Sequence, residues 1–293
     1  MNLRDQASRA GVFFLCLVSY FQSAFTGLLP NPAMLLPIAA AAILTPFAER
    51  GLKRSLTLLF LAHTFAMAAA SLLVLNPIRQ LLGPTSAELA SIVVVRNVLL
   101  YGMLLALPLS IAALAAAGYI SERKPRRGKI AAAFCLAAIP LSSALLLYSY
   151  SDWYNEVYAV KTLSVELESA RYATSGEYPT LELKLSLRTS SPKAVYVDCT
   201  RYYVYSGDKL VRQAADSYPE GMQVSEAGRE ISKSLSLPSD LPPTCFTQGS
   251  CTVKLQLVVR TRFGLSLIDF PLNLSSKAPH VPAWLLGRLE ESL

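Results

Sequence analysis

The sequence predicts a membrane α-helical bundle of five transmembrane helices followed by an all-β domain of the immunoglobulin-like sandwich class. Long apolar runs dominate residues 11–150, whereas residues 151–293 have the composition of an ordinary globular domain. The chain of 293 residues is 53% hydrophobic with a mean hydropathy of +0.38, which is too apolar for a purely soluble protein. In the second half the apolar periodicity changes from helical to alternating. We therefore expect one domain over 1–150 and another over 151–293.

The charges divide at the same place as the hydropathy. Residues 1–149 hold twelve Lys and Arg against four Asp and Glu, and the remainder holds fifteen basic against sixteen acidic residues. The basic residues of the first part lie in short segments between apolar runs, where membrane proteins carry them. The pI near 9.2 therefore does not indicate binding to nucleic acid.

Five apolar runs have the length of membrane-spanning helices, which need roughly 20 residues to cross about 30 Å of hydrocarbon. The uncharged run 11–47 is too long for one crossing, and the Pro-Asn-Pro segment at 30–32 predicts a turn within it. The Asn-Pro pair at 76–77 is expected to end the third helix and Pro108 to kink the fourth. The predicted spans are about 11–29, 32–48, 55–75, 92–119 and 130–149.

The orientation follows from the distribution of basic residues. The N-terminus and the segments 49–54 and 120–129 hold ten Lys and Arg, whereas the alternate segments 30–32 and 76–91 hold one. This predicts a multi-pass protein of the cell membrane with a cytoplasmic N-terminus and an extracytoplasmic C-terminal domain. A cleaved signal peptide over 1–29 is the alternative for the first run, and it is disfavoured because a second apolar run follows at once. The aromatic residues expected to form an outer belt are Tyr148, Tyr150, Trp153 and Tyr154.

Two polar residues inside the predicted spans are candidate functional positions, His63 and Arg96. A lone histidine cannot supply bis-histidine haem ligation or a metal site within this part of the chain, so a hydrogen bond to a neighbouring helix is the favoured interpretation of His63. Arg96 lies about one turn from the outer end of the fourth span, from which its side chain is expected to reach the headgroups. The spans contain no Asp or Glu, which disfavours a proton relay or a cation-coupled transporter.

Alternating apolar and polar residues predict the strands of the second domain. The predicted strands lie at about 163–168, 181–188, 194–205, 229–237, 253–260 and 265–272. Turn-forming Ser, Gly, Asp and Pro residues separate them. Six or seven short strands over roughly 120 residues are typical of an immunoglobulin-like β-sandwich.

A specific order of motifs runs through this domain. A strand at 181–187 leads into a Thr-Ser-Ser-Pro turn at 189–192, and a tyrosine-rich strand ends in a Gly-Asp-Lys hairpin at 207–209. The segment 264–271 then reads Gly-Leu-Ser-Leu-Ile-Asp-Phe-Pro. This order resembles the water-stress and hypersensitive-response domain, the type-2 late-embryogenesis-abundant β-sandwich, over roughly 157–278. The family's usual Asn-Pro turn is matched here only by Ser-Pro. The resemblance implies a non-enzymatic, often membrane-tethered protein and carries over no catalytic residues.

Cysteines and one sequon are the remaining candidate sites of this domain. Cys199, Cys245 and Cys251 allow three single pairings, and we prefer Cys245 with Cys251 because these two bracket a short loop. Metal binding is not expected, since His280 is the domain's one histidine. The sequon that begins at Asn273 is a candidate glycosylation site on the outer side.

The C-terminal tail at 282–293 is amphipathic. Its apolar residues at 284, 285, 289 and 293 fall near one face of a helix. The tail is expected either to pack on its own domain or to rest on the membrane surface, and its short length and acidic end favour the first.

These patterns favour a non-enzymatic structural or accessory subunit of a membrane complex. The lipid bilayer and membrane or surface proteins are its expected partners, and no cofactor or nucleic acid is expected. The alternative is a transporter or channel component with the sandwich as an accessory domain. A membrane enzyme is disfavoured, because the outer domain has one histidine and no Gly-x-Ser-x-Gly pattern.

Overall fold

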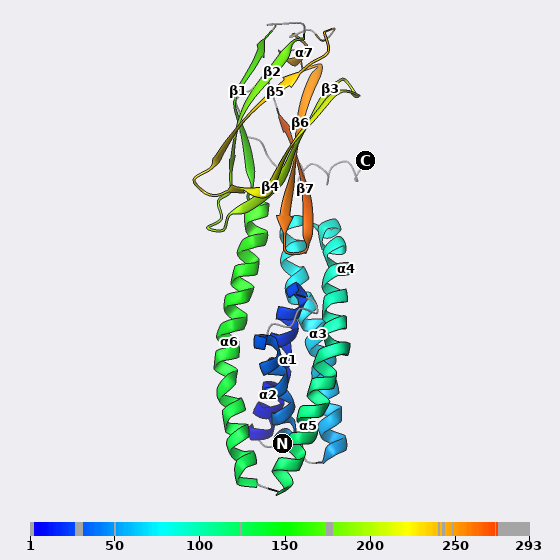
Figure 1. The fold of residues 1–293 in the computed structure, drawn as a ribbon, viewed down its shortest axis with the longest axis vertical. Coiled ribbons are helices and arrows are strands. Elements are labelled where there is room, and N and C mark those ends of the chain that lie inside the picture. Colours follow the sequence, from blue (N-terminus) through cyan, green and yellow to red (C-terminus); the bar gives the residue numbers. More distant parts are fainter. Residues whose placement is uncertain are drawn as a thin grey trace. The chain divides into compact units, whose positions relative to one another are not determined.

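A computed structural model of the chain describes residues 3–26, 32–49, 51–123, 125–173, 178–239, 241, 244–247, 249–272 and 274. Helices form the N-terminal half and antiparallel sheets form the C-terminal half (Figure 1). The chain divides into two compact units, Met1–Trp153 and Tyr154–Leu293. We call them the helical unit and the β unit and describe each by itself.

Helices account for nearly all of the described part of the helical unit. They are α1 (Leu3–Thr26), α2 (Pro32–Ala48), α3 (Leu52–Leu82), α4 (Pro84–Tyr101), α5 (Leu107–Arg123) and α6 (Pro125–Lys161), with the π-helix η1 (Gly102–Ala106) joining α4 to α5. Among the described residues, two helical stretches are long and apolar enough to cross a membrane, Leu52–Leu82 and Ser86–Tyr119, and a shorter apolar helix covers Leu35–Pro46. Length and hydropathy within the structure thus support two spanning helices and not the five that the sequence predicts.

The third helix does not end at the Asn-Pro pair, as the sequence predicted. α3 runs through Pro77, which is buried inside it, and ends before Gly83. A proline inside a helix removes one backbone hydrogen bond, but packing of the surrounding turns outweighs that local loss. Gly83 has a φ of 93°, a conformation that favours glycine, and it therefore separates α3 from α4.

The last helix extends twelve residues past its predicted end at 149. Over this extension Trp153, Val157 and Val160 are buried, with the spacing of one helical face. The opposite face is polar, so mean hydropathy falls although the helix continues. α6 therefore crosses the boundary between the two units as one helix.

A π-helix, η1, lies directly before Pro108, where the sequence predicts a kink. In η1 the backbone N–H of Leu107 donates to the carbonyl of Gly102, five residues earlier. Pro108 follows directly and offers no N–H of its own to the helical ladder. The widened turn joins α4 and α5 into one continuous helical stretch.

α1 forms the centre of the helical unit. Almost all side chains from 11 to 24 are buried or half-buried, and α1 packs against α2, α3 and α4. The outward faces of the surrounding helices are apolar: Phe60 and Phe65 on α3 are 61% and 62% exposed, and Met103 is 65% exposed. A soluble bundle places polar residues on its outer face, so this distribution is reversed.

The β unit contains seven strands in two antiparallel sheets. The strands are β1 (Ser164–Ala173), β2 (Thr180–Arg188), β3 (Val195–Ser206), β4 (Lys209–Val224), β5 (Arg229–Ser236), β6 (Cys251–Thr261) and β7 (Gly264–Leu272), and a short helix, α7, covers Thr244–Thr247. One sheet has the order β1-β2-β5 and the other the order β4-β3-β6-β7. Inward side chains of both sheets are buried, among them Leu185, Tyr202 and Phe270. Burial raises the pKa of the Tyr202 hydroxyl above its usual range.

β4 is the strand that the sequence does not predict. It lies at the edge of the four-stranded sheet, pairs with β3 alone, and is exposed over most of its length. An edge strand needs no apolar alternation, and Pro219 interrupts the strand pattern further. Five of the other six strands were predicted within two residues of their observed ends, whereas β1 continues five residues beyond its predicted end at 168.

Side chains from the turn between β2 and β3 form hydrogen bonds with the last turns of α6, which belong to the β unit. Thr189 donates through Oγ1 to the carbonyl of Ala159 at 2.9 Å, and Ser191 donates through Oγ to the carbonyl of Asn155 at 3.1 Å. Ala159 is among the last four residues of the helix, whose carbonyls lack a backbone partner within the helix, whereas the carbonyl of Asn155 lies one turn earlier. The β unit therefore begins as a helix and not as a strand.

Candidate functional site

The helical unit encloses a set of hydrogen-bonded polar side chains, which we call the buried polar cluster: Ser19, Tyr20, His63, Tyr101 and Ser110. His63 Nδ1 lies 2.8 Å from Tyr20 Oη, and His63 Nε2 lies 2.9 Å from Ser110 Oγ. The hydroxyls of Ser19 and Tyr101 are 2.6 Å apart. The ring of Tyr20 meets the rings of His63 and Tyr101 edge-on, each at a centroid distance of 5.6 Å. The cluster thus connects α1, α3, α4 and α5.

His63 is placed by the structure at the centre of this cluster and not at a pocket wall. Its side chain is 1% exposed and both ring nitrogens have hydrogen-bond partners on other helices. An imidazole with both nitrogens occupied has no donor or acceptor left for a ligand. The arrangement can cross-link three helices, which agrees with the interpretation favoured from the sequence.

A close approach of helices accompanies the cluster. Gly102 lies at the start of η1, where a Cβ atom would come within 3.0 Å of Met67 Sδ and 3.1 Å of Tyr20 Oη. The absence of a side chain at Gly102 lets α1 and α3 approach the α4–η1 junction. Sequence reasoning missed this role, since the neighbours of a glycine are set by tertiary packing.

The other polar and aromatic candidates of the helical unit divide between surface and interior. Arg96 is exposed on α4, and Tyr148 is 74% exposed on α6. Trp153 is instead 2% exposed and donates through Nε1 to the carbonyl of Val74 at 3.1 Å. The predicted outer aromatic belt is therefore corrected at this residue: Trp153 packs against α3, because its indole N–H finds a backbone acceptor there.

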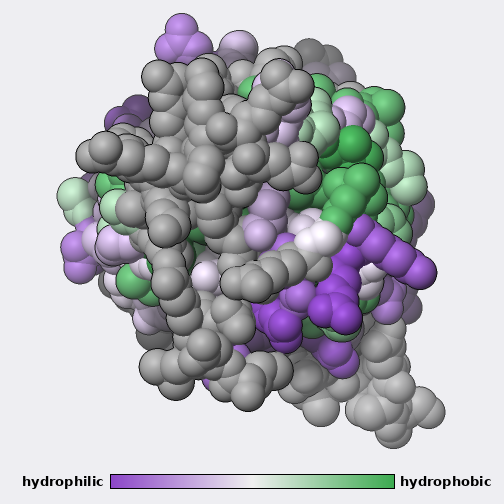
Figure 2. All heavy atoms as spheres, turned by 90° about the horizontal axis from the view of Figure 1, so that it is seen from below, coloured by the Kyte–Doolittle hydropathy of each residue, from purple (hydrophilic) through white to green (hydrophobic). Residues whose placement is uncertain are grey.

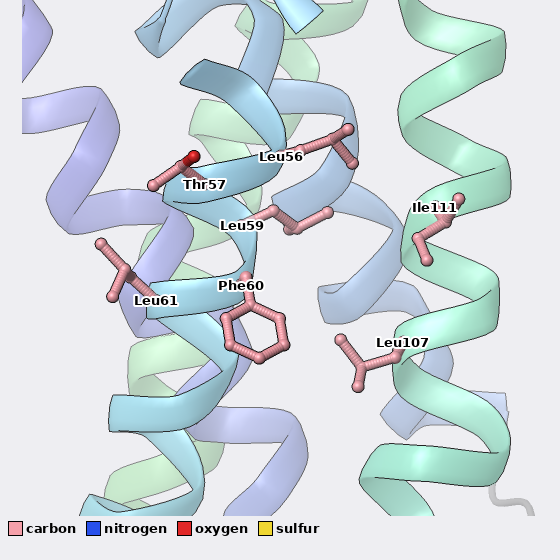
Figure 3. A pocket seen from close by; sticks show the side chains of 7 residues that line it. All are labelled: Leu56, Thr57, Leu59, Phe60, Leu61, Leu107 and Ile111. Carbon is pink, nitrogen blue, oxygen red and sulfur yellow. The ribbon is translucent and has the colours of Figure 1, made fainter. Parts of the chain in front are cut away.

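An open apolar groove of about 360 Å³ lies between α3 and α5. Leu56 and Leu59 of α3 extend toward Leu107 and Ile111 of α5 (Figure 3). Thr57 is the one polar residue of its wall, and neither His63 nor Arg96 lines it. The groove suits a hydrocarbon chain or an apolar helix and offers no groups for binding an ion.

Charged residues gather at the end of the helical unit where α2 passes into α3. Arg9 of α1 forms an ion pair with Glu49, and Lys53 and Arg54 are exposed at the start of α3. The view from below shows hydrophilic residues concentrated on one part of this face beside hydrophobic ones (Figure 2). α3 therefore begins at a charged end, which we call the charged rim.

The outer face of the four-stranded sheet carries a hydrogen-bonded set, which we call the outer network: Arg201, Tyr203, Lys254, Gln256 and Asp269. Gln256 Oε1 accepts from Arg201 Nη1 at 3.3 Å and from Tyr203 Oη at 3.4 Å. Gln256 Nε2 donates to Asp269 Oδ1 at 2.8 Å, and Lys254 Nζ lies 2.6 Å from Asp269 Oδ2. The network spans β3, β6 and β7 and holds its side chains in place without burying them.

Strand register explains how the outer network forms. Arg201 pairs with Gln256 across β3 and β6, and Gln256 pairs with Asp269 across β6 and β7. Residues directly opposite in neighbouring strands share a face, so three polar side chains come into one row. Sequence analysis did not single out these residues, because pairing between β3 and β6 joins segments more than fifty positions apart.

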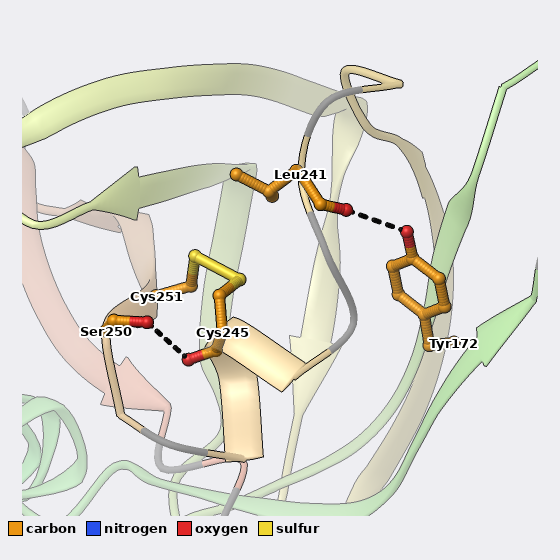
Figure 4. The surroundings of a disulfide bond; sticks show 5 residues. All are labelled: Tyr172, Leu241, Cys245, Ser250 and Cys251. Carbon is orange, nitrogen blue, oxygen red and sulfur yellow. Dashed lines mark hydrogen bonds between the residues drawn. A yellow bond between two sulfur atoms is a disulfide. The ribbon is translucent and has the colours of Figure 1, made fainter.

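The preferred cysteine pair is at disulfide distance in the β unit (Figure 4). Cys245 of α7 and Cys251 at the start of β6 have Cα atoms 5.1 Å apart, and Cys199 is free. Ser250 donates through Oγ to the carbonyl of Cys245 at 3.2 Å, and Tyr172 donates through Oη to the carbonyl of Leu241 at 3.0 Å. These contacts fix the segment that enters β6.

Three predictions concern residues outside the described part of the chain: glycosylation at Asn273, the position of His280 and the amphipathic tail at 282–293. Among the residues that the structure describes, no group of three or more His, Cys, Asp and Glu side chains is placed to hold a metal ion.

Comparisons with known proteins were made for the whole chain. No protein-family model matches it, and no curated protein matches it. A crystal structure of a protein from Archaeoglobus fulgidus matches at 14% sequence identity with a TM-score of 0.28, over 36% of this chain and 92% of that chain.

Proposed function

We propose that this chain is a non-enzymatic, multi-pass membrane protein, an accessory or structural subunit whose β unit binds a protein partner outside the membrane. The observation that carries the proposal is the apolar outer surface of the helical unit. In each of the two helical stretches that are long and apolar enough to cross a membrane, only 33% of the apolar window is buried. The core helix of a soluble protein is mostly buried, so the exposed side chains of these two stretches need lipid or a partner to cover them.

Five membrane crossings with a cytoplasmic N-terminus are part of this proposal. The charged rim with Lys53 and Arg54 supports a cytoplasmic position for the α2–α3 connection, because basic residues concentrate on that side. α2 is shorter than a typical span and pairs with α1 as the second half of a hairpin. With five crossings the β unit lies on the extracytoplasmic side, where a disulfide persists.

For the β unit we propose an immunoglobulin-like sandwich related to the water-stress and hypersensitive-response family. Seven antiparallel strands divided three and four between two sheets support the first part. The order of motifs in the sequence supports the second. A sandwich fold and a relationship to this family both favour a binding module over an enzyme.

The outer network is the proposed partner-binding surface. Tyrosine and arginine are enriched at the centres of protein interfaces, and Arg201 and Tyr203 are only half-buried on one flat face. Their hydrogen bonds to Gln256 hold the side chains in fixed orientations before a partner arrives, which reduces the entropy lost on binding. A transporter or channel component is the weaker candidate. Both ring nitrogens of His63 already have hydrogen-bond partners, and the groove between α3 and α5 is apolar, so neither offers groups that would bind an ion.

The membrane part is tested by labelling single cysteines in sealed membrane vesicles. Cys16, Cys135 and Cys199 are replaced by Ala, and the chain then carries either Lys53→Cys or Lys209→Cys, both at exposed positions. A membrane-impermeant maleimide should reach the two cysteines from opposite sides of the membrane. Reaction of both from the same side, or release of the protein by alkaline carbonate, would contradict the proposal.

The partner-binding part is tested by purification in mild detergent followed by mass spectrometry. The paired variant Arg201→Ala with Tyr203→Ala should lose a co-purifying chain that the wild type retains. Lys184→Ala is the matched control: Lys184 lies in the other sheet, where it bridges Glu168 at 2.8 Å and Glu230 at 3.0 Å. A monodisperse monomer without any partner in the wild type would overturn this part.

A further inference from the structure

Lys53 shares one face of α3 with residues that line the groove between α3 and α5. Residues three, four and seven positions apart lie on the same side of a helix, and Leu56, Thr57 and Phe60 stand at those distances from Lys53. Over these seven residues the helix rises about 10 Å. The groove therefore begins within one helical turn of a basic side chain of the charged rim.

The two basic residues at the start of α3 have no acidic partner. Lys53 and Arg54 are exposed, and neither forms an ion pair with any residue that the structure describes. Arg9 of the same rim differs from them, because it is paired with Glu49. An anion placed beside Lys53 and Arg54 would be attracted by both charges.

The walls of the groove offer hydrocarbon and almost nothing else. Leucines of α3 point toward Leu107 and Ile111 of α5 (Figure 3). The hydroxyl of Thr57 donates to the carbonyl of Lys53 at 2.9 Å, so its proton is already used within α3. A ligand that fills the groove therefore needs an apolar chain, and a ligand that also meets the rim needs an anionic group beside that chain.

We infer that the groove and the rim together bind an anionic phospholipid, with one acyl chain between α3 and α5 and the phosphate at Lys53 and Arg54. This inference rests on the proposed membrane insertion. Lysine and arginine near the end of a membrane helix extend their apolar stems along it and hold their charges at the depth of the phosphates. The proposed topology also puts this rim on the cytoplasmic side, where anionic lipids are concentrated.

A phospholipid fits the groove better than a helix of a partner or of a second copy does. Helices associate inside membranes mainly where small residues let their backbones approach closely. The groove is lined instead by large side chains, among them Phe60, which is 61% exposed, and Ile111, which is 53% exposed. A flexible acyl chain can follow such an uneven surface, and its own headgroup supplies the anion for the rim.

The test is native mass spectrometry of the full-length protein in dodecyl maltoside. The protein is titrated with dioleoyl phosphatidylglycerol or with dioleoyl phosphatidylcholine, which carry the same acyl chains on an anionic and a zwitterionic headgroup. Phosphatidylglycerol should fill one site more tightly than phosphatidylcholine, and equal affinities would overturn the inference. Glycerol 3-phosphate has the charge without the chains and should not displace the lipid; displacement would show a site for anions alone.

The rim is tested by Lys53→Gln with Arg54→Gln, which removes both charges and keeps most of each stem. Each basic residue near an anionic lipid contributes about a fivefold gain in affinity, so this variant should bind phosphatidylglycerol roughly 20-fold more weakly. Its affinity for phosphatidylcholine should stay unchanged. Arg79→Gln with Arg96→Gln is the matched control, because it removes two exposed charges that lie outside the groove. Equal losses in the two variants would overturn a specific role for the rim.

The groove is tested by Ile111→Trp, which adds a ring where the acyl chain would lie. Leu56→Trp adds one from the opposite wall and guards against a ring that turns outward at one position. Both variants should weaken the binding of both lipids. Leu72→Trp is the control, since Leu72 is 68% exposed on α3 and does not line the groove. Full phosphatidylglycerol affinity in both groove variants would overturn the placement of the chain.

A separate measurement distinguishes failure of this inference from failure of membrane insertion. Maleimide labelling of Lys53→Cys and Lys209→Cys in sealed vesicles reports insertion without reference to any bound lipid. Labelling from opposite sides together with equal affinity for the two lipids would overturn the inference and leave insertion standing. Labelling from the same side would overturn insertion, and the inference with it.

Discussion

His63 forms hydrogen bonds with hydroxyl groups of two other helices, and this determines what its loss should do. The imidazole contacts Tyr20 on one side and Ser110 on the other, at 2.8 Å and 2.9 Å. Removing it leaves two buried hydroxyls without those partners, and each such group costs about 1–3 kcal/mol. His63→Ala should therefore lower the thermal midpoint of the detergent-purified protein by several degrees.

Thr64→Ala is the control for this prediction. Thr64 is the next residue of α3 but is exposed, and its hydroxyl returns to the carbonyl of Phe60 in its own helix. Its replacement should leave the midpoint unchanged within the error of a thermal-shift measurement. Equal midpoints for the two variants would contradict a cross-linking role for the histidine.

Two glycines of the continuous α4–α5 stretch provide a second comparison at the residue scale. A Cβ at Gly118 would meet nothing within 4 Å, whereas a Cβ at Gly102 would press on Met67 and Tyr20. Alanine in place of glycine normally stabilises a helix interior by about 0.5–1 kcal/mol. Gly118→Ala should raise the thermal midpoint, and Gly102→Ala should lower it because Tyr20 is held by His63. Two increases of equal size would count against a close approach at Gly102.

At the scale of elements, local pattern identified most helices and strands but not their ends or their partners. The uncharged runs located α1 and α2, and alternating leucines located β2 and β6. α3 passed through its proline because buried packing outweighs a local signal. α6 continued beyond the membrane run because an amphipathic helix has low mean hydropathy. β4 was missed because an edge strand needs no apolar alternation.

The disulfide between α7 and β6 is an element whose contribution can be measured. It closes a loop with a sequence separation of 6. For a loop of this size the entropy of the unfolded chain predicts a stabilisation of about 2 kcal/mol. The double variant Cys245→Ser with Cys251→Ser should therefore exchange backbone hydrogens faster in the first residues of β6, as measured by mass spectrometry.

Cys199→Ser is the comparison for the disulfide variant, because Cys199 is free and half-buried in β3. It should leave exchange in β6 close to that of the wild type. If the double variant exchanged no faster than Cys199→Ser, the disulfide would contribute no local stability.

At the scale of the whole molecule, the distribution of apolar side chains is the property that sequence and structure share. Hydropathy predicted that the first half is covered by lipid, and the structure places large apolar residues on the outward faces of α3, α4 and α5. The candidate sites were less predictable. His63 was identified because an isolated polar residue stands out in an apolar run. The outer network was not, because it depends on the register between distant strands.

A charge on the outward face distinguishes a lipid-covered helix from a water-covered one. Phe65 is 62% exposed near the middle of α3. In water, Phe65→Lys would be neutral or would improve solubility, whereas at the centre of a membrane helix lysine costs about 2.5–3.5 kcal/mol. We expect Phe65→Lys to reduce the yield of membrane-integrated protein. Leu210→Lys, at an exposed position of the β unit, should leave the yield unchanged, and equal yields would contradict the proposed insertion.

The central position of α1 has a consequence for the order in which the protein is assembled. Translation produces α1 before the other described helices, but the acceptor for Gln22 is the hydroxyl of Ser149, which lies 127 positions later in α6. Tyr20 similarly depends on His63, and the carbonyl of Ala24 on Asn97. α1 is therefore translated before the helices that surround it but is enclosed only after the last of them, α6, has been made. A chain interrupted before α6 lacks the Ser149 hydroxyl and leaves the Gln22 amide without that acceptor, which distinguishes an unfinished molecule from a finished one.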